Sequence, residues 1–457
     1  MLLRRLTCKG LAQNAYVLAH GGEALVVDPR RDVDDLLALL AAEKLRATWV
    51  VATHVHADFV AGLHEVAAAT GARIGLGERF RGRLPHTPLA DGQTLRVGDA
   101  TIEVLATPGH TLESVSFHVH AHADAPARLL SGDALFVGDV GRPDLAQGAG
   151  MAPSAMAALL HHTLHERLAA LPGDVEVWPA HGAGSACGSC IGGASSSTLA
   201  AERADNWAFR CRDRDAFVAQ LLRSLRPPPR HFPRLAAINH DGATPLGVLL
   251  PPSALDAAAV ASACAAGAMV LDCRSWTEFG RGHWPSATNI GLDGGEFEPW
   301  AGALIPADRP LVLHATSAAR AAEAQLRLLR VGLDDVRGFT TTLPERPGRV
   351  PQLEALDLFT PGGAVPFQVI DVRRPDEFAA GHVAGAVHVE LGETMATGGL
   401  DPTRPTAVLC EGGYRSSAAL ATLRSAGFTA LHNVHDGMRG WRQNHLPLAR
   451  AAPTATS

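Results

Sequence analysis

Five apolar runs in the first half of the chain each lead into histidine or aspartate, and this pattern constrains the fold more than any other feature. The runs are Glu23–Pro29, Ala47–Phe59, Thr101–Thr111, Arg128–Phe136 and Val175–Gly184. Short apolar runs bounded by turn residues are typical of buried strands, and helical stretches lie between them. An α/β fold commonly builds its site from polar groups delivered at one end of a sheet. The pattern therefore predicts an α/β domain with His and Asp side chains along one sheet edge.

The polar residues at these strand ends have the character of a metal site. They are His54, His56 and Asp58 on one short loop, followed by His110, Asp133 and His181. A lone histidine is more often a hydrogen-bonded core or surface residue. Several at successive strand ends, beside Gly or Pro, instead indicate metal ligands, since neutral imidazole binds transition metals well.

The motifs HxHxD, PGHT, SGD and PAHG, in this order, resemble those of the metallo-β-lactamase superfamily. The resemblance implies an αββα sandwich with the metal at one edge of the sheets. Hydrolytic relatives of the glyoxalase II kind show HxHxDH, where the last histidine serves a second metal, but here Phe59 takes that position. Two-metal hydrolysis needs both ions, so this change counts against it. The stretches Ser131–Leu145 and His181–Gly188 resemble persulfide dioxygenases, especially those fused to rhodanese domains.

That resemblance implies a single, mononuclear Fe(II) held by His54, His110 and Asp133. Two histidines and one carboxylate on one face leave three positions open for substrate and O2. Zinc, which lacks redox chemistry, could not serve this purpose. Arg142 matches an arginine that lies near the substrate in the family, and an ordinary loop salt bridge is the equally weighted alternative.

The remaining polar groups of this region have less definite roles. The resemblance implies that His56, Asp58 and His181 line or support the site, although the sequence equally permits His56 as a ligand. Cys187 and Cys190 form a CxxC pair, but no second pair exists to complete a zinc knuckle. In some rhodanese-fused relatives a cysteine of this loop approaches the iron, so Cys187 is a candidate for receiving sulfur.

The second half of the chain contains an internal repeat. Ala268–Ile290 matches Phe367–Val389 in register, with an apolar strand, Asp, Arg, an acidic-Phe pair and Gly-His in each. Such a repeat indicates two related α/β domains. The Pro- and Arg-rich segment Arg223–Leu235 and the chain just after it are interpreted as connecting chain, and Pro344–Leu356 separates the copies. The predicted domains are 1–240, 245–345 and 350–452.

A thiol loop stands in the second copy, where a strand leads into Cys410-Glu-Gly-Gly-Tyr-Arg415-Ser and then a helix. Inward-turned backbone N–H groups and a helix N-terminus lower a thiol pKa and stabilise a persulfide anion. Arg415 supplies a fixed cation for an anionic donor such as thiosulfate. With Asp371 and His382 upstream, the loop resembles the active-site loop of rhodaneses. Four residues separate Cys from Arg, as in that family, whereas phosphatases of similar design have a longer loop.

The first copy departs from this pattern at the thiol. Aligning Pro310–Leu326 with Thr406–Leu423 puts His314 at the position of Cys410, and both loop glycines are lost. Without a nucleophile, this copy is expected to be inert and to act as a spacer or docking domain.

Composition and charge narrow the function classes. A net charge of −6 over 457 residues gives no electrostatic reason to expect nucleic acid or an anionic membrane as partner. No apolar run is suited to span a bilayer, the N-terminus lacks signal-peptide features, and seven scattered cysteines cannot form a complete disulfide framework. A cytoplasmic location is the default expectation. The oligomeric state, a homo-oligomer included, stays open.

The resemblance to persulfide dioxygenase–rhodanese fusions implies one reading of the whole chain. It implies Fe(II)-dependent oxidation of a low-molecular-weight persulfide, glutathione persulfide foremost, by O2 to sulfite and thiol, coupled to rhodanese sulfur transfer through a persulfide of Cys410. Two alternatives stay open: a two-zinc thioester hydrolase of the glyoxalase II type with an accessory rhodanese, and a non-catalytic sulfur carrier. The sequence does not choose the carrier thiol or the direction of sulfur transfer.

Overall fold

The computed structural model describes residues 1–457 except 123–124, 146–149, 248, 360–365, 393–394 and 451–457. The chain divides into two compact units. The first comprises Met1–Leu249 with Leu329–Gly332, and the second comprises Leu250–Leu328 with Leu333–Ser457.

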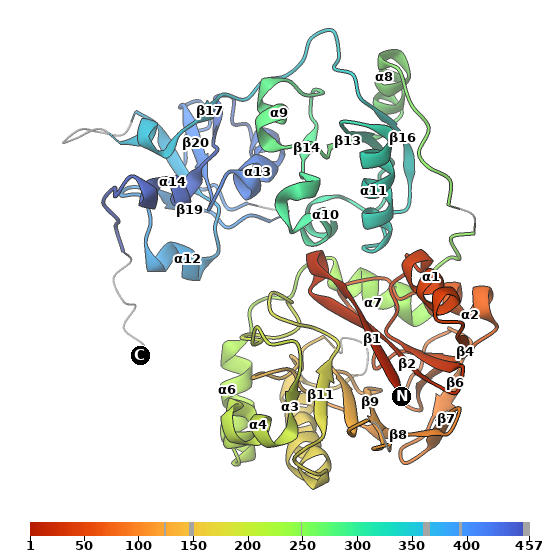
Figure 1. Ribbon diagram of the computed structural model, residues 1–457. Coiled ribbons are helices and arrows are strands. Elements are labelled where there is room, and N and C mark those ends of the chain that lie inside the picture. The colour runs from red at the N-terminus through yellow and green to blue at the C-terminus, as the bar shows by residue number, and fades with distance from the viewer. Residues whose placement is uncertain (123–124, 146–149, 248, 360–365, 393–394, 451–457) are drawn as a thin grey trace. The chain divides into compact units, whose positions relative to one another are not determined.

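Two six-stranded sheets form the centre of the first unit (Figure 1). The first sheet runs in chain order and contains β1 (Leu2–Cys8), β2 (Gln13–His20), β3 (Glu23–Val27), β4 (Arg46–Val51), β5 (Arg73–Gly77) and β6 (Thr87–Leu89). The second runs in reverse order and contains β7 (Thr94–Val97), β8 (Ala100–Ala106), β9 (Val115–Val119), β10 (Arg128–Gly132), β11 (Glu176–Pro179) and β12 (Ser197–Thr198). Both sheets mix parallel and antiparallel pairs.

Helices cover the outer face of each sheet, because successive strand residues point to opposite faces. On β2, Tyr16 and Leu18 enter the core between the sheets, while Val17 and Ala19 enter the core beneath the helices. The first sheet is covered by α1 (Asp34–Ala42) and α2 (Leu63–Thr70), and the second by α3 (Pro153–His162), α4 (Leu199–Asp205), α5 (Trp207–Arg210) and α6 (Arg214–Ser224). The predicted αββα sandwich is therefore confirmed.

Helix α7 (Phe232–Asp241) occupies a segment that the sequence suggested was connecting chain. Its proline lies in the first turn, where a missing N–H costs nothing. Phe232, Leu235 and Asn239 lie on the buried face, at the spacing of a helix. Phe232 packs with Ala57 and Cys187, so this helix reaches the predicted metal loop.

The second unit contains two parallel sheets (Figure 1). The first copy of the repeat has the order β14-β13-β15-β16, made of β13 (Met269–Asp272), β14 (Thr288–Asn289), β15 (Leu311–His314) and β16 (Val336–Thr340). Its helices are α8 (Ala257–Ala265), α9 (Trp276–Arg281), α10 (Phe297–Leu304) and α11 (Ala318–Leu329).

The second copy has the order β17-β21-β20-β18-β19. Its strands are β17 (Gln352–Leu353), β18 (Gln368–Asp371), β19 (Val387–His388), β20 (Thr406–Leu409) and β21 (Leu431–Val434). Its helices are α12 (Pro375–Ala380), α13 (Tyr414–Ser425) and α14 (Gly437–Gln443).

The repeated Asp-x-Arg motif forms the same contacts in both copies. Arg274 Nη2 lies 2.6 Å from Asp272 Oδ2, and Arg373 Nη2 lies 2.7 Å from Asp371 Oδ2. Each arginine also donates to the carbonyl oxygen of the glycine in the Gly-His pair, at 2.8 Å. The buried ion pair thus ties the first strand to the turn after the next helix, which explains why the motif recurs.

Strand register corrects the position assigned to His314. It lies opposite the aspartate that ends β13, whereas Leu409 lies opposite the aspartate that ends β18. Since these aspartates are equivalent, His314 corresponds to Leu409, and the next residue, Ala315, corresponds to Cys410. The sequence alignment was wrong by one residue, because the loop between strand and helix is one residue shorter in the first copy.

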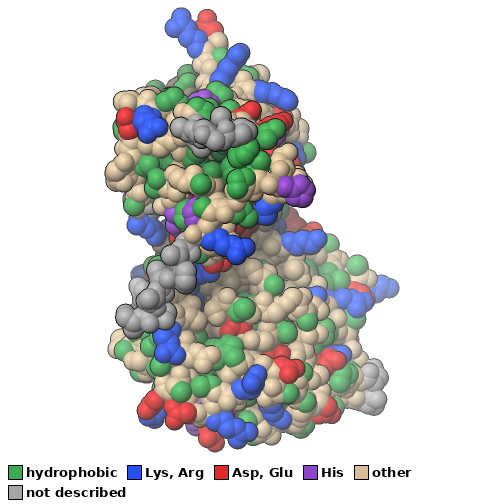
Figure 2. Space-filling view, turned by 90° about the vertical axis from the view of Figure 1, so that its left-hand side faces the viewer, with side chains coloured by type: hydrophobic (Ala, Val, Ile, Leu, Met, Phe, Trp, Pro, Cys, Tyr) green, Lys and Arg blue, Asp and Glu red, His purple; other side chains and the backbone are tan. Residues whose placement is uncertain are grey.

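The described residues contain no helix that is long and apolar enough to cross a membrane. On the face drawn in Figure 2, leaving the grey atoms aside, acidic and basic side chains are interspersed. Neither sign gathers there into one large patch, in keeping with the modest net charge of −6.

Candidate metal centre and thiol loop

Three of the predicted ligands meet at the strand ends of the first unit. His54 Nε2 lies 3.6 Å from Asp133 Oδ2, and His110 Nε2 lies 3.5 Å from the same oxygen. All three side chains are buried, and neither His54 Nε2 nor Asp133 Oδ2 has a hydrogen-bond partner among the described residues. A buried polar atom without a partner is costly unless something else binds it. These atoms therefore fit a metal ion bound between two imidazoles and one carboxylate.

The other ring nitrogen of each histidine fixes its protonation. His110 Nδ1 lies 2.8 Å from the carbonyl oxygen of Arg142, so it must carry the hydrogen. His54 Nδ1 lies 2.9 Å from Thr53 Oγ1, whose hydroxyl donates to Asp28 at 2.8 Å. Burial lowers the pKa of both histidines. Each ring is therefore a neutral imidazole with a free Nε2, the form that binds a metal.

His181 bridges two carboxylates behind the site. Its Nδ1 lies 2.7 Å from Asp133 Oδ1, and its Nε2 lies 2.8 Å from Asp58 Oδ2. Burial lowers the pKa of His181, but Asp133 and Asp58 outweigh burial and hold it well above the usual value. Burial likewise opposes ionisation of Asp133, yet His181 and His54 hold its pKa below the usual range. His181 is thus an imidazolium that fixes the ligand carboxylate in position.

The region where a second metal would bind contains His56, Asp58 and His181 beside the apolar ring of Phe59. Ligand atoms of His56, Asp58 and His181 lie within 4.8 Å of one another, so they too could hold an ion. However, His56 Nε2 lies 3.0 Å from a carboxylate oxygen of Asp28, and His181 faces Asp58. The fully buried Phe59 ring lies 4.3 Å from that of His56 and 6.4 Å from that of His181. Phe59 therefore brings an apolar face where hydrolytic relatives have a ligand.

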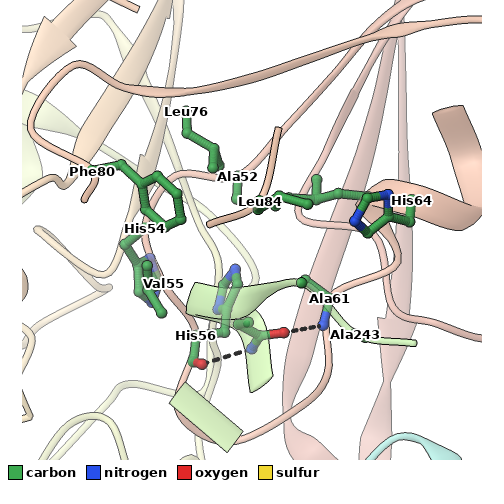
Figure 3. Close-up of a pocket in the computed structure, with 13 residues that line it drawn as sticks. Ala52, His54, Val55, His56, Ala61, His64, Leu76, Phe80, Leu84 and Ala243 are labelled. Carbon is green, nitrogen blue, oxygen red and sulfur yellow. Dashed lines mark hydrogen bonds between the residues drawn. The ribbon is translucent and has the colours of Figure 1, made fainter. Parts of the chain in front are cut away.

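Asn239 on α7 holds the HxHxD loop, a role that the sequence analysis did not predict. Its Nδ2 donates to the carbonyl oxygens of His56 and Phe59 at 2.8 and 2.7 Å, and its Oδ1 accepts from Ala61 N at 2.8 Å. His54 and His56 line a small pocket together with apolar side chains (Figure 3), and Asn239 is among the residues that line it. The helical spacing of buried residues on α7 is the signal that could have revealed it.

The Gly-Arg-Pro-Asp segment packs directly over the ligands. A Cβ on Gly141 would lie 2.1 Å from the carbonyl oxygen of Asp133 and 2.8 Å from His110 Nδ1, so only glycine fits. Arg142 is buried and forms a two-pronged ion pair with Asp144, at 2.7 and 2.8 Å. It also donates to the carbonyl oxygens of Ala186 and Arg226. The structure therefore gives Arg142 the loop salt bridge, while its contact with substrate stays a prediction.

Cys187 lies against the metal ligands. Its Sγ and atoms of Asp133 and His181 form a group within 4.8 Å, and its side chain is buried. Asp139 positions this loop by accepting from Ser189 N and Cys190 N, at 2.8 and 2.6 Å. Burial, with the nearby carboxylates, raises the pKa of Cys187 well above its usual value. In this arrangement Cys187 is a neutral thiol.

In the second unit, Cys410 follows β20 at the start of the predicted loop. Its buried Sγ accepts from Gly413 N at 3.1 Å and lies 3.4 Å from Ser416 Oγ. Gly413 has a φ of 90°, a conformation that glycine adopts readily, and helix α13 begins at the next residue. The loop thus directs a backbone donor and a helix N-terminus at the sulfur, as predicted from the sequence.

Two arginines stand near this loop. Arg415 is nearly buried and forms a two-pronged ion pair with Glu377, at 2.6 and 2.8 Å. Burial raises the pKa of Glu377, but Arg415 outweighs burial and holds it at about 2. The sequence analysis did not predict a role for Arg439. Its guanidinium lies so close to Gly412 that a Cβ added to this glycine would be only 2.7 Å from Nη2. Because Arg439 is exposed, it places a positive charge beside the thiol loop.

The first copy contacts the helix that follows the thiol loop. Ser417 Oγ donates to Asn289 Oδ1 at 2.7 Å, and the rings of Tyr414 and Trp276 meet edge to face at 6.3 Å. Figure 1 shows α13 beside β14 and α9. The first copy therefore supports the Cys410 loop structurally, although it has no thiol in its own loop.

Comparisons with known families agree with this geometry. The model of the metallo-beta-lactamase superfamily matches residues 8–181, and that of the rhodanese-like domain matches residues 256–340 and 354–444. The human "Persulfide dioxygenase ETHE1, mitochondrial" is 33% identical over 160 residues, 35% of this chain and 59% of its own length. The bovine protein of that name is 31% identical, over 40% of this chain and 68% of its own length.

Two further comparisons broaden the picture. A hydroxyacylglutathione hydrolase of Acidiphilium cryptum is 40% identical over 29% of this chain and 53% of its own length. A crystal structure of a metallo-beta-lactamase from Staphylococcus aureus superposes with a TM-score of 0.66 at 30% identity, covering 74% of this chain and 98% of that one. The chain thus spans just over half the length of several curated relatives.

Proposed function

Because the chain belongs to the metallo-beta-lactamase superfamily, with persulfide dioxygenases among its homologues and tandem rhodanese-like domains after it, we propose that it oxidises a low-molecular-weight persulfide. Glutathione persulfide is the foremost candidate. One persulfide, one O2 and one water give sulfite, the free thiol and two protons. The observation that carries the proposal is the convergence of His54, His110 and Asp133, with buried ligand atoms that lack partners, while Phe59 lies against the neighbouring His56 and His181.

We assign His54, His110 and Asp133 as the ligands of a single Fe(II). Iron bound there would supply the redox chemistry with O2 and leave three adjacent positions open for reactants. Asp133 is oriented by the imidazolium of His181, and His110 is oriented by the Arg142 carbonyl. Such outer partners fix ligand geometry and raise ligand basicity.

A two-metal thioester hydrolase is the second candidate, since hydroxyacylglutathione hydrolases are also relatives. Two-metal hydrolysis requires a complete second ligand set. Phe59 removes one ligand from that set, and Asp58 and His181 already pair with each other. The chain's own residues therefore favour the one-metal centre.

We further propose that Cys410 carries sulfane sulfur. Its thiolate would attack the outer sulfur of thiosulfate, forming a cysteine persulfide and releasing sulfite. A free thiol would then take the sulfur, restore Cys410 and leave as a persulfide for the first unit. The Gly413 N–H stabilises negative charge on the sulfur, and the Arg439 guanidinium gives an anionic donor a cationic entry.

The decisive experiment measures O2 uptake and sulfite formation with glutathione persulfide on iron-loaded protein. His110→Ala should lose nearly all of both, and the exposed His162→Ala should retain them. The same preparations are tested for thioester hydrolysis after zinc loading. Hydrolysis by the zinc form, without O2 uptake by the iron form, would reject the dioxygenase in favour of the hydrolase.

A further inference from the structure

Beyond the proposed function, we propose that the first unit binds a second divalent transition metal of the zinc type at Glu103, His118 and His120. Glu103 lies on β8, His118 lies on β9, and His120 follows directly after β9. Ligand atoms of the three side chains lie within 4.8 Å of one another. No residue of this cluster takes part in the candidate metal centre.

The distances suit a single ion. Glu103 Oε2 lies 3.5 Å from His118 Nδ1 and 3.5 Å from His120 Nε2, so the carboxylate oxygen stands between the two rings. Ligands of a tetrahedral zinc, with bonds of about 2.0–2.1 Å, are about 3.3 Å apart. The two carboxylate–imidazole distances are therefore within about 0.2 Å of those in a shared zinc site, and the two imidazole nitrogens lie within 4.8 Å of each other. Water can complete the coordination, because His120 is 47% exposed.

His118 provides an independent indication of a ligand. Its side chain is 8% exposed, yet neither ring nitrogen forms a hydrogen bond with any described residue. Burial and the neighbouring His120 lower the pKa of His118, although Glu103 acts against them. A buried imidazole with both ring nitrogens unpartnered, one of them 3.5 Å from a carboxylate oxygen, is an arrangement that a shared metal ion would satisfy.

The strand pairing explains how these residues come together. Glu103 lies directly opposite His118 in the antiparallel β8–β9 pair, and residues two apart on a strand share a face. The outer face of the second sheet thus receives Glu103, His118 and His120. Glu103 lies in the middle of β8 and His118 near the end of β9, so neither belongs to the connecting loop that carries His110. A metal here would clamp β8 to β9 and stabilise the hairpin without entering the reaction.

The test uses full-length, iron-loaded protein equilibrated with zinc chloride and then desalted. Wild type should retain one additional zinc per chain, with an affinity measured by competition against a chromophoric chelator. His120→Ala and Glu103→Gln should weaken this binding at least about tenfold, since even outer-sphere partners of a metal are worth that much. Both side chains are partly exposed, so these changes leave folding intact.

Matched controls separate the proposal from its alternatives. His162→Ala removes another exposed histidine of the same unit and should keep the additional zinc. His110→Ala should also keep it, even where iron and O2 uptake are lost, so the two sites succeed or fail separately. The zinc-dependent rise in thermal midpoint should disappear only in the cluster variants. Equal zinc binding by wild type and both cluster variants, or equal loss in His162→Ala, would overturn the assignment.

Discussion

Replacing Asn239 by alanine should loosen the loop that carries the candidate metal ligands. The side chain makes three hydrogen bonds of 2.7–2.8 Å, to the carbonyl oxygens of His56 and Phe59 and to the N–H of Ala61. Asn239 is 8% exposed, and both carbonyls lie in buried surroundings. Truncation therefore leaves polar backbone groups without partners within the HxHxD motif and just after it.

The magnitude follows from the cost of those unpaired groups. Each buried polar group left without a partner costs about 1–3 kcal/mol. The adjoining pocket has about 20 Å³ of free volume, so water can enter and offset part of the loss. We expect local opening of the loop to become easier by about 3 kcal/mol, which corresponds to roughly hundredfold faster amide exchange.

Hydrogen exchange followed by mass spectrometry measures this directly for peptides spanning residues 54–61. A local measurement is needed because a chain of several domains does not unfold in one two-state step. Asn239→Asp should fall between wild type and alanine in its effect on Ala61, because it keeps the acceptor and loses both donors. His240→Ala, on the same helix and 45% exposed, is the control and should leave exchange unchanged. Exchange in Asn239→Ala within about twofold of wild type would refute the reasoning.

Three other outcomes are expected. Cys410→Ser should abolish sulfur transfer from thiosulfate while O2 uptake with added persulfide continues. The control Cys190→Ser, which changes an exposed thiol, should preserve both activities. Loss of O2 uptake in Cys410→Ser would contradict separate sites. Phe59→His should bind one metal ion per chain more than wild type and introduce thioester hydrolysis with zinc. Metal content equal to that of wild type would show that Phe59 is not what excludes the second ion of the candidate centre. The ion pair between Glu377 and Arg415 holds the Glu377 pKa at about 2, so its stabilisation is present above the usual carboxyl pKa and is lost as pH falls towards 2. Glu377→Gln should therefore lower the thermal midpoint at neutral pH and approach wild type near pH 2, and a pH-independent difference would speak against the pair.

Much of the first unit could be predicted because its strands carry two sequence signals, an apolar run and a polar residue at the strand end. The five apolar runs coincide with β3, β4, β8, β10 and β11, and alternation on β2 sends Tyr16 and Val17 into different cores. The ends of separate strands then bring His54, His110 and Asp133 together, since strand ends on one side of a sandwich meet at one edge. Asn239 escaped prediction because it lies about 180 residues beyond the loop that it holds. Its helix also begins among prolines that look like a linker.

Partners of charged residues were harder to predict than their positions. Arg142 pairs with Asp144, two residues away, so the sequence could offer that salt bridge as an alternative. Arg415 pairs with Glu377, which stands 38 residues earlier on another helix. No local pattern links these two residues, because the pairing arises only when α12 and α13 pack in the folded domain. The sequence analysis therefore predicted that Arg415 offers its charge to a substrate anion. In the structure the carboxylate of Glu377 already pairs with it.

The first rhodanese copy shows what a thiol loop requires beyond its thiol. Similarity alone placed His314 against Cys410, but backbone pairing makes Ala315 the equivalent residue. A register error of one residue changes which side chain faces the loop, since neighbours on a strand point to opposite faces. The first copy also lacks the loop glycines, of which Gly413 directs its N–H at the sulfur in the second copy. Restoring a cysteine at Ala315 would therefore supply a nucleophile without the donor that stabilises its anion, and loop geometry separates the two copies as much as residue identity does.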